Sequence, residues 1–573
     1  MLLFKTTKTI YMKNVFYYLL IATLIFPSCK KDFLDKTPLD SYADGQVWND
    51  INLVNSYVTQ NYRAITSHNF GWPAAGSLDV WKGAQWGGLC AYGYGWGGVV
   101  DEAFELHDWY GFPQPLLDGS ISPSNATSFG RWNENYGYIR AINIFFSKID
   151  EVRGDAKLKE RLKGEMYFLR AFCYNELTKH YGGVILIDKV YGVADKDFQE
   201  TRSSYDACVN FIVSDLEKAA SLLPLTYQDV DQGRVTNGAA LALKSNLLLF
   251  AASPLHNPGN DKSKWQKAAD AAKAVIDLGK YSLYKPANYA NVFLDHGNSE
   301  VILAKYYNGT AEDWWHTNYE NTINRDLSPV SYFGWGMATP IQEMVDAYEM
   351  IDGTKFNWSN PVHSANPYNN RDPRFYATIF FDGAMHKGRA VETYEGGHDN
   401  PTGATVEITN ATTTGYYLRK FVDDNYDQST KPWTQDNMVI FIRLSEIYLN
   451  YAEANAELGN TTVALEYLNR IRQRVNMPSV SASGTLLIDK IMQERRIELA
   501  FEGQRFFDVR RRKILDQVMK PVSGIKIIKS PNGDRSFSVF QRQARVYSEK
   551  SYYFPIPATE IQKNSKLTQN PGY

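Results

Sequence analysis

The chain has few of the residues and spacings that usually indicate a metal site or a disulfide framework. Its 573 residues include four cysteines and nine histidines, and no HExxH or CxxC spacing occurs. These spacings are common signatures of zinc sites, so we predict no metal ligands. Cys90, Cys173 and Cys208 are too widely separated for a disulfide framework, and we expect Cys173 and Cys208 to be small buried residues of helices.

The chain also lacks an excess of charge of either sign. The chain has 61 lysines and arginines against 63 aspartates and glutamates, which gives a formal net charge of −2. A nucleic-acid-binding surface needs a basic patch that neutralises phosphates. Outside residues 494–511 no large cluster of basic residues occurs, so we expect no nucleic-acid partner.

No apolar run is long enough to span a membrane, because a spanning helix needs about 20 apolar residues. The run at 15–26 follows Lys13 and ends just before Cys29. A short apolar run behind a positive charge is typical of a secretory signal peptide. A cysteine at the expected cleavage point resembles a bacterial lipobox, although Phe26 and Pro27 are poor matches to the usual leucine and small residue. We therefore predict that Cys29 is lipidated, and Met12 is a better start for such a signal than Met1.

Helical periodicity recurs along most of the remaining chain. The predicted helices are 49–64, 132–149, 158–179, 205–222, 239–252, 265–278, 439–458 and 463–474. The last two are separated by Gly459 and Asn460 and resemble a tetratricopeptide unit, with Ala452 and Ala464 where the helices would approach closely. We predict a mainly α fold: a tetratricopeptide-like superhelix of helical pairs with long irregular loops and a few short strands.

Residues 494–511 carry an unusual density of charge among apolar residues. Glu494, Glu498 and Glu502 follow one another at i,i+4, so on one helix they form a stripe of like charge that must be offset. Arg505 would lie on the same face. We interpret the segment as a structural ion-pair network and predict that Glu498 and Arg505 are structural. A cluster of catalytic acids is the alternative.

Two irregular segments, 70–115 and 306–335, concentrate tryptophan in a chain that is 14% aromatic. A flat indole can stack on the apolar face of a sugar ring while nearby polar groups bond its hydroxyls. Any single tryptophan can instead belong to the core. The predicted ligand-binding residues are Asp79, Trp81, Trp86, Trp96, Trp314, Trp315 and Trp335.

Paired carboxylates could also indicate a glycoside hydrolase. The available pairs are Asp101 with Glu102, Glu392 with Glu395, and Glu446 with Glu453. For Glu446 and Glu453 we expect structural pairing with Arg443 or Arg470. A GxGxxG spacing at residues 93–98 lacks the preceding strand that a dinucleotide site requires. We predict no catalytic residue and no cofactor.

Four stretches together resemble the SusD/RagB family of surface nutrient-binding lipoproteins. They are GEMYFLRAFCYNELTKHYGGV at 164–184, RLSEIYLNYAEANAELGN at 443–460, the charged segment 494–511, and YYFPIPATEIQKNSKLTQNPGY at 552–573. They occur in the order expected of that family. One departure is Arg512, near which the family usually carries a tryptophan, so the local packing there can differ.

The resemblance implies a function and a location for the chain. It implies a lipid-anchored, surface-exposed protein of the outer membrane that captures oligosaccharides or polysaccharides and delivers them to a SusC-like TonB-dependent transporter. Peptide binding, as in RagB-like relatives, and glycoside hydrolysis are the alternatives. The implied organisation is a signal peptide at 1–28, a lipidated N-terminus and tether at 29–48, an N-terminal helical region at 49–280 and a C-terminal region at 281–573.

Overall fold

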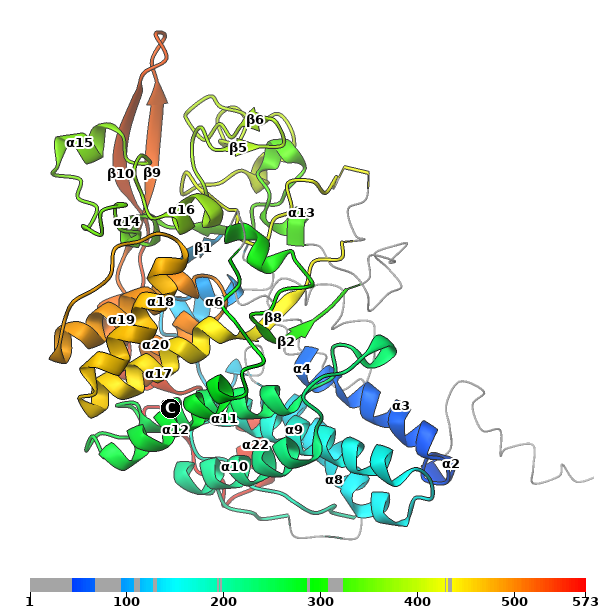
Figure 1. The fold of residues 1–573 in the computed structure, drawn as a ribbon. Helices are drawn as coiled ribbons and strands as arrows, with labels where there is room; N and C mark the ends of the chain where they lie inside the picture. Colours follow the sequence, from blue (N-terminus) through cyan, green and yellow to red (C-terminus); the bar gives the residue numbers. More distant parts are fainter. Residues whose placement is uncertain are drawn as a thin grey trace, which may run out of the picture.

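A computed structural model describes residues 44–66, 94–107, 114–126, 131–192, 195, 198–285, 289–307, 323–427, 429–430 and 435–573. The fold is mainly α with a few short strands, as predicted (Figure 1). The longer helices are α3 (Ile51–Asn61), α8 (Trp132–Lys148), α9 (Ala156–Tyr181), α10 (Tyr205–Leu222), α11 (Asn237–Ala252), α12 (Lys262–Asp277), α17 (Leu444–Leu458), α18 (Thr461–Arg474) and α19 (Gly484–Glu498).

Consecutive helices pack against one another in a continuous series. Helix α8 contacts α9, and the contacts continue through α10, α11 and α12 to α17, α18 and α19. Helices α11 and α12 therefore join the N-terminal helices in the lower part of Figure 1 to the C-terminal ones above them. A stack of helical pairs in which each helix contacts its neighbours is the tetratricopeptide-like arrangement that the sequence predicted.

Local capping signals explain where several of these helices begin and end. The side chain of Asp155 accepts hydrogen bonds from the first turn of α9, and Ser204 and Thr236 cap α10 and α11 in the same way. Gly459 ends α17 in the left-handed conformation (φ 87°), which glycine adopts without strain. Ala452 of α17 and Ala464 of α18 are fully buried, and these two helices pack against each other.

The predicted helix 439–458 was wrong in its first residues. Residues Val439–Arg443 form strand β8, which pairs antiparallel with β2 (Val301–Lys305), and α17 begins only at Leu444. The β-branched and aromatic residues of this segment favour a strand. A helix was predicted because a short buried strand and part of a buried helix show similar runs of apolar residues.

The described strands form five separate two-stranded sheets. Besides β2 with β8, β1 (Ala103–Glu105) pairs with β3 (Ala338–Pro340), β4 (Ile379–Phe380) with β7 (Tyr417–Leu418), and β5 (Met385–His386) with β6 (Arg389–Ala390). The longest pair, β9 (Val522–Lys529) and β10 (Arg535–Gln543), projects from the top of the molecule (Figure 1).

The remaining α-helices among the described residues are short. They are α2 (Asp44–Val47), α4 (Arg63–Thr66), α6 (Tyr94–Gly97), α7 (Gln114–Leu117), α13 (Ile323–Leu327), α14 (Gln342–Ala347), α15 (Pro361–Ala365), α16 (Pro373–Thr378), α20 (Gln504–Arg511), α21 (Leu515–Val518) and α22 (Ala558–Lys563).

Two hydrophobic clusters make up the core of the described residues. The larger fills the helical stack and includes Cys173 and Cys208, which are both fully buried and unbridged, as predicted. The smaller lies beneath the short sheets and takes apolar residues from β1, β3, β4, β7 and β9. Among the helices described, none is long and apolar enough to cross a membrane.

Candidate functional site

The charged segment 494–511 does not form one helix. Helix α19 ends at Glu498, and α20 begins at Gln504. Between them Phe501 (φ 62°) and Gly503 (φ 83°) take left-handed conformations that reverse the chain. The predicted stripe of three glutamates was therefore wrong, because Glu502 lies in the turn and not on the face of Glu494 and Glu498.

Glu498 is nevertheless the centre of a buried ion-pair network. Its side chain is fully buried and accepts hydrogen bonds from Arg374 (3.0 Å), Arg443 (2.6 Å) and Arg474. Burial alone would raise the pKa of Glu498, but the three guanidinium groups outweigh it and hold the pKa well below its ordinary value. The predicted structural role of Glu498 is thus confirmed, with partners that come from three other elements.

The predicted position of Arg505 on the same helix face as the three glutamates was wrong, because Arg505 lies on α20. Its guanidinium forms two hydrogen bonds of 2.8 Å with Asp101, which Arg496 also contacts at 3.1 Å. Glu502 instead pairs with Arg443 and with the buried Lys420. The two pairs with Asp101 join residues about 400 positions apart in the sequence: Asp101 lies just before β1, Arg496 on α19 and Arg505 on α20. They stabilise the tertiary structure, so Arg505 is structural as predicted.

In two of the three carboxylate pairs considered for hydrolysis, one member is held by arginine. Asp101 is held by Arg505 and Arg496, and Glu453 accepts two hydrogen bonds from Arg511 and none from Arg443 or Arg470. Arg470 pairs with Glu466, so the expected pairing was also wrong. Glu395 forms an ion pair with Lys526 at 2.7 Å. Asp101 and Glu453 are engaged by arginine in the core, which argues against either of them as the acid or nucleophile of a hydrolase.

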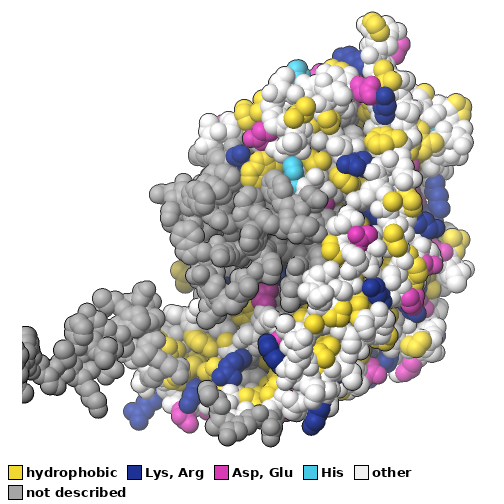
Figure 2. All heavy atoms as spheres, turned by 180° about the vertical axis from the view of Figure 1, so that it is seen from behind, with side chains coloured by type: hydrophobic (Ala, Val, Ile, Leu, Met, Phe, Trp, Pro, Cys, Tyr) yellow, Lys and Arg dark blue, Asp and Glu magenta, His cyan; other side chains and the backbone are white. Residues whose placement is uncertain are grey.

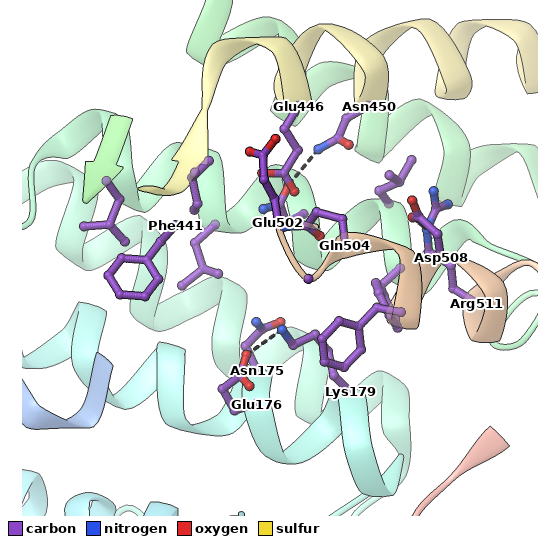
Figure 3. A pocket seen from close by; sticks show the side chains of 18 of the residues that line it. Asn175, Glu176, Lys179, Phe441, Glu446, Asn450, Glu502, Gln504, Asp508 and Arg511 are labelled. Atoms are coloured by element: carbon purple, nitrogen blue, oxygen red, sulfur yellow. Dashed lines mark hydrogen bonds and ion pairs between the residues drawn. The ribbon is translucent and has the colours of Figure 1, made fainter. Parts of the chain in front are cut away.

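A cavity of about 150 Å³ lies among helices α9, α11, α17 and α20. Figure 3 shows Asn175, Glu176 and Lys179 on one wall, and Glu446 and Asn450 on the opposite wall. Drug-sized ligands usually occupy clefts of about 300–1,000 Å³. The cavity is therefore too small for an oligosaccharide.

Glu446 is the least satisfied carboxylate in that cavity. It is buried, and within the described part of the chain its side chain makes no hydrogen bond. Burial raises the pKa of Glu446 to about 7, because desolvation disfavours the charged form more than Arg495 stabilises it. The expected pairing of Glu446 with Arg443 or Arg470 is not formed.

Described residues near the C-terminal ends of the two tryptophan-rich segments meet at one small sheet. β1, near the end of segment 70–115, pairs with β3, which follows directly on segment 306–335. The backbone N–H of Leu106 donates to Met337 (2.9 Å), and the ring of His107 lies 3.2 Å from the carbonyl oxygen of Trp335. The scaffold thus joins the C-terminal ends of both segments, although they are more than 200 residues apart in the sequence.

Trp96 is packed into the helical core. Its side chain is 7% exposed and lies on α6, with its ring centroid 4.0 Å from that of Phe506 and 5.8 Å from that of Phe507. Such burial favours the core interpretation of this tryptophan over stacking on a ligand.

Trp335 is partly exposed and held in place from one side. The guanidinium of Arg325 lies 4.7 Å from its ring, and its backbone N–H donates to the carbonyl of Arg325 at 2.6 Å. A held, partly exposed indole is suited to stacking. Of the other predicted site residues, Asp79, Trp81, Trp86, Trp314 and Trp315 lie outside the described residues.

One exposed aromatic in the same turn was missed in the sequence. Phe333 is 55% exposed and has a positive φ of 63°. The clustering of tryptophans does not indicate Phe333, but the alternation of aromatic residues with Gly334 and Gly336 indicates a tight turn that presents aromatic rings.

Charged side chains of both signs are spread over the described surface. On the described part of the face shown in Figure 2, basic and acidic side chains are interspersed. Such a mixed surface differs from the continuous basic strip that phosphate recognition uses.

Comparisons with known proteins agree with this architecture. The SusD family model matches residues 299–573, and a model described as starch-binding associating with outer membrane matches residues 110–249. A solved SusD-like protein from Bacteroides fragilis is 32% identical, covers 94% of this chain and 100% of its own, and superimposes with a TM-score of 0.78.

Two further relatives extend the comparison. A SusD-like protein of Bacteroides ovatus is 22% identical, with 96% of this chain and 94% of the relative aligned. A solved laminarin-binding SusD-like protein is 23% identical, with 92% of this chain and all of the other covered and a TM-score of 0.66, so its likeness concerns the fold. The matched segments, the helical stack and the 32% identity over nearly the whole chain together show that this chain belongs to the SusD/RagB family.

Proposed function

We propose that the protein captures oligosaccharides or polysaccharides at the outer membrane of the cell. The observation that carries this proposal is the meeting of both tryptophan-rich segments at the β1–β3 sheet, with Trp335 partly exposed beside His107. Aromatic rings on a rigid scaffold suit the apolar faces of sugar rings. The descriptions of one matching family model and of a laminarin-binding relative support a carbohydrate ligand.

The contact surface in this proposal is formed by Asp79, Trp81, Trp86, Trp314, Trp315 and Trp335. Trp96 is left out of this surface, because its ring is packed against Phe506 in the core. No residue of this surface is assigned a catalytic role, and the function is binding alone.

The anchor and the transport partner belong to the same proposal. Lipidation of Cys29 after removal of residues 1–28 holds the chain at the outer membrane, with residues 29–48 as a tether. Captured glycan then passes to a SusC-like TonB-dependent transporter. Residues 49–280 and 281–573 are the two regions that the family resemblance implies, and helices α12 and α17 pack together across that division.

The test is a binding screen of the purified protein against a panel of neutral and acidic polysaccharides. Calorimetric titration should detect at least one ligand, and no hydrolysis product should accumulate. Binding of peptides but of no polysaccharide would favour the RagB-like alternative. Release of reducing ends from the ligand would instead indicate a glycoside hydrolase.

A further inference from the structure

Phe333 combines two features that folding alone does not explain. The side chain is 55% exposed, so its ring gains little from burial. Its backbone has φ 63° and ψ 24°, the left-handed region that bulky residues rarely adopt and that glycine and asparagine tolerate. A strained and exposed aromatic residue is costly for the fold, and such outliers cluster at ligand-binding positions.

The turn around Phe333 is held on both sides. Ahead of it, the N–H of Phe333 donates to Val330 (3.0 Å). Beyond it, Gly334 approaches Ser328 so closely that a Cβ atom would lie 1.8 Å from the Ser328 carbonyl oxygen, and the N–H of Trp335 donates to Arg325 (2.6 Å). These contacts fix the backbone, so the Phe333 ring is presented by a rigid turn.

Arg389, at the start of β6, lies against the same turn. Its guanidinium is stacked 3.8 Å from the ring of Tyr332, and Nη2 donates to the carbonyl oxygen (2.6 Å) and hydroxyl (2.9 Å) of Ser331. The Tyr332 hydroxyl in turn donates to the Arg389 carbonyl oxygen (3.1 Å). Arg389 is exposed, and its Nε and Nη1 donate no hydrogen bond within the described ranges. The turn thus combines an exposed aromatic ring with free donors on a fixed guanidinium.

We propose that Phe333 is a stacking platform for a sugar ring and that Arg389 donates hydrogen bonds to oxygen atoms of the same ligand. The Phe333 ring stacks on the apolar C–H face of the sugar, and the Arg389 guanidinium donates hydrogen bonds to the hydroxyl or carboxylate oxygens of the sugar. The inference rests on the proposed glycan-capture function and extends its binding surface from Trp335 across Gly334 to Phe333. Arg389 and Phe333 come from segments more than 50 residues apart and meet through the Ser331 contacts.

The test compares Phe333→Asn with the wild type, using the full chain purified in detergent. Asparagine tolerates the left-handed backbone, so the variant should melt at the same or a higher temperature. Its affinity for the polysaccharide that the wild type binds should fall about tenfold, as expected for loss of one aromatic anchor. Phe333→Trp should retain the affinity, because it keeps a stacking surface. Phe540→Ser is the matched control, since Phe540 is 39% exposed on β10, and its affinity should not change.

The possible results distinguish a failure of the Phe333 platform from a failure of the proposed glycan capture. Equal affinity of Phe333→Asn and wild type would overturn the platform while glycan capture stands. A lower melting temperature of Phe333→Asn with unchanged affinity per folded molecule would make Phe333 structural and overturn the platform in the same way. A wild type that binds no polysaccharide of a panel containing starch, laminarin, xylan and polygalacturonate would overturn both.

Discussion

Replacing Glu498 with glutamine removes the negative charge at the centre of the buried network while preserving the size of the side chain. Glu498 is fully buried and accepts from Arg374, Arg443 and Arg474, and its Oε1 also lies 3.1 Å from the hydroxyl of Tyr289. Glutamine retains one acceptor oxygen, but its amide donors face guanidinium donors. The variant therefore leaves positive charge in the core without compensation.

The expected cost follows from the burial of the group. Removing one partner of a buried ion pair destabilises proteins by about 3–5 kcal/mol, because the remaining charge is stranded away from water. Arg374 keeps Asp372 and Glu494, and Arg443 keeps Glu300 and Glu502, so part of the charge remains compensated. We expect a loss of roughly 3 kcal/mol, at the lower end of that range.

The loss should be measured by urea denaturation of the wild type and the variant at pH 7. The pH dependence gives a second signature. Because the pKa of Glu498 is depressed in the folded protein, its contribution is present above the ordinary glutamate pKa of 4.5 and is lost as the pH falls below it. The stability difference between wild type and Glu498→Gln should therefore shrink as the pH is lowered from 5 to 3.

Glu466→Gln is the matched control, because it removes the same charge from the partly exposed pair of Glu466 with Arg470. Surface pairs spaced i,i+4 contribute only about 0.3–0.5 kcal/mol. The reasoning would be refuted if Glu498→Gln destabilised no more than Glu466→Gln. Native stability combined with loss of ligand binding would instead make Glu498 part of a binding site.

Three further predictions concern the anchor, the tryptophans and the cavity. Cys29→Ala should move the protein from the membrane to the soluble fraction on cell fractionation; retention without a bound partner would contradict lipidation. Replacing one tryptophan of the proposed surface with alanine should weaken glycan binding by about 1–2 kcal/mol with little change in melting temperature; the variants are Trp81→Ala, Trp86→Ala, Trp314→Ala, Trp315→Ala and Trp335→Ala. Trp96→Ala should instead lose about 3–5 kcal/mol of folding stability. Early melting of all six variants with intact binding per folded molecule would place the site elsewhere. Because burial raises the pKa of Glu446 to about 7, the folded state binds this proton more tightly than the unfolded state does and loses stability as the pH rises from about 4.5 through 7. Glu446→Gln should be more stable than wild type at pH 8 and equally stable near pH 4, and equal stability at both pH values would show that Glu446 is not held neutral.

Local signals in the sequence determined the helical scaffold. Apolar periodicity predicted α10 with both ends correct, and it predicted α8, α9, α11 and α12 to within a few residues. These helices depend on nearest neighbours in the chain, on caps such as Ser204 and stops such as Gly459. The segment 439–443 was misassigned, because a short apolar run becomes a strand only when β2 lies beside it.

The partners of the buried charges were decided by the tertiary structure. The sequence showed that residues 494–511 hold too many charges for an isolated helix, and it correctly predicted that Glu498 must be paired. It did not identify Arg374, Arg443 and Arg474 as the partners, because they come from α16, β8 and α18. Likewise, the partner of Arg505 is Asp101, about 400 residues earlier in the chain.

The candidate binding surface likewise depends partly on the sequence and partly on the tertiary structure. Composition and the clustering of tryptophans in two irregular segments suggested a stacking site, and the residue types alone suffice for that hypothesis. Whether a given ring is packed or presented depends on what surrounds it: Trp96 is buried against Phe506, while Phe333 is exposed on a strained turn. Residue type thus determined which chemistry this protein can offer a ligand, and only the folded chain decided which rings face outward, because the burial of a ring such as Trp96 depends on contacts between segments far apart in the sequence.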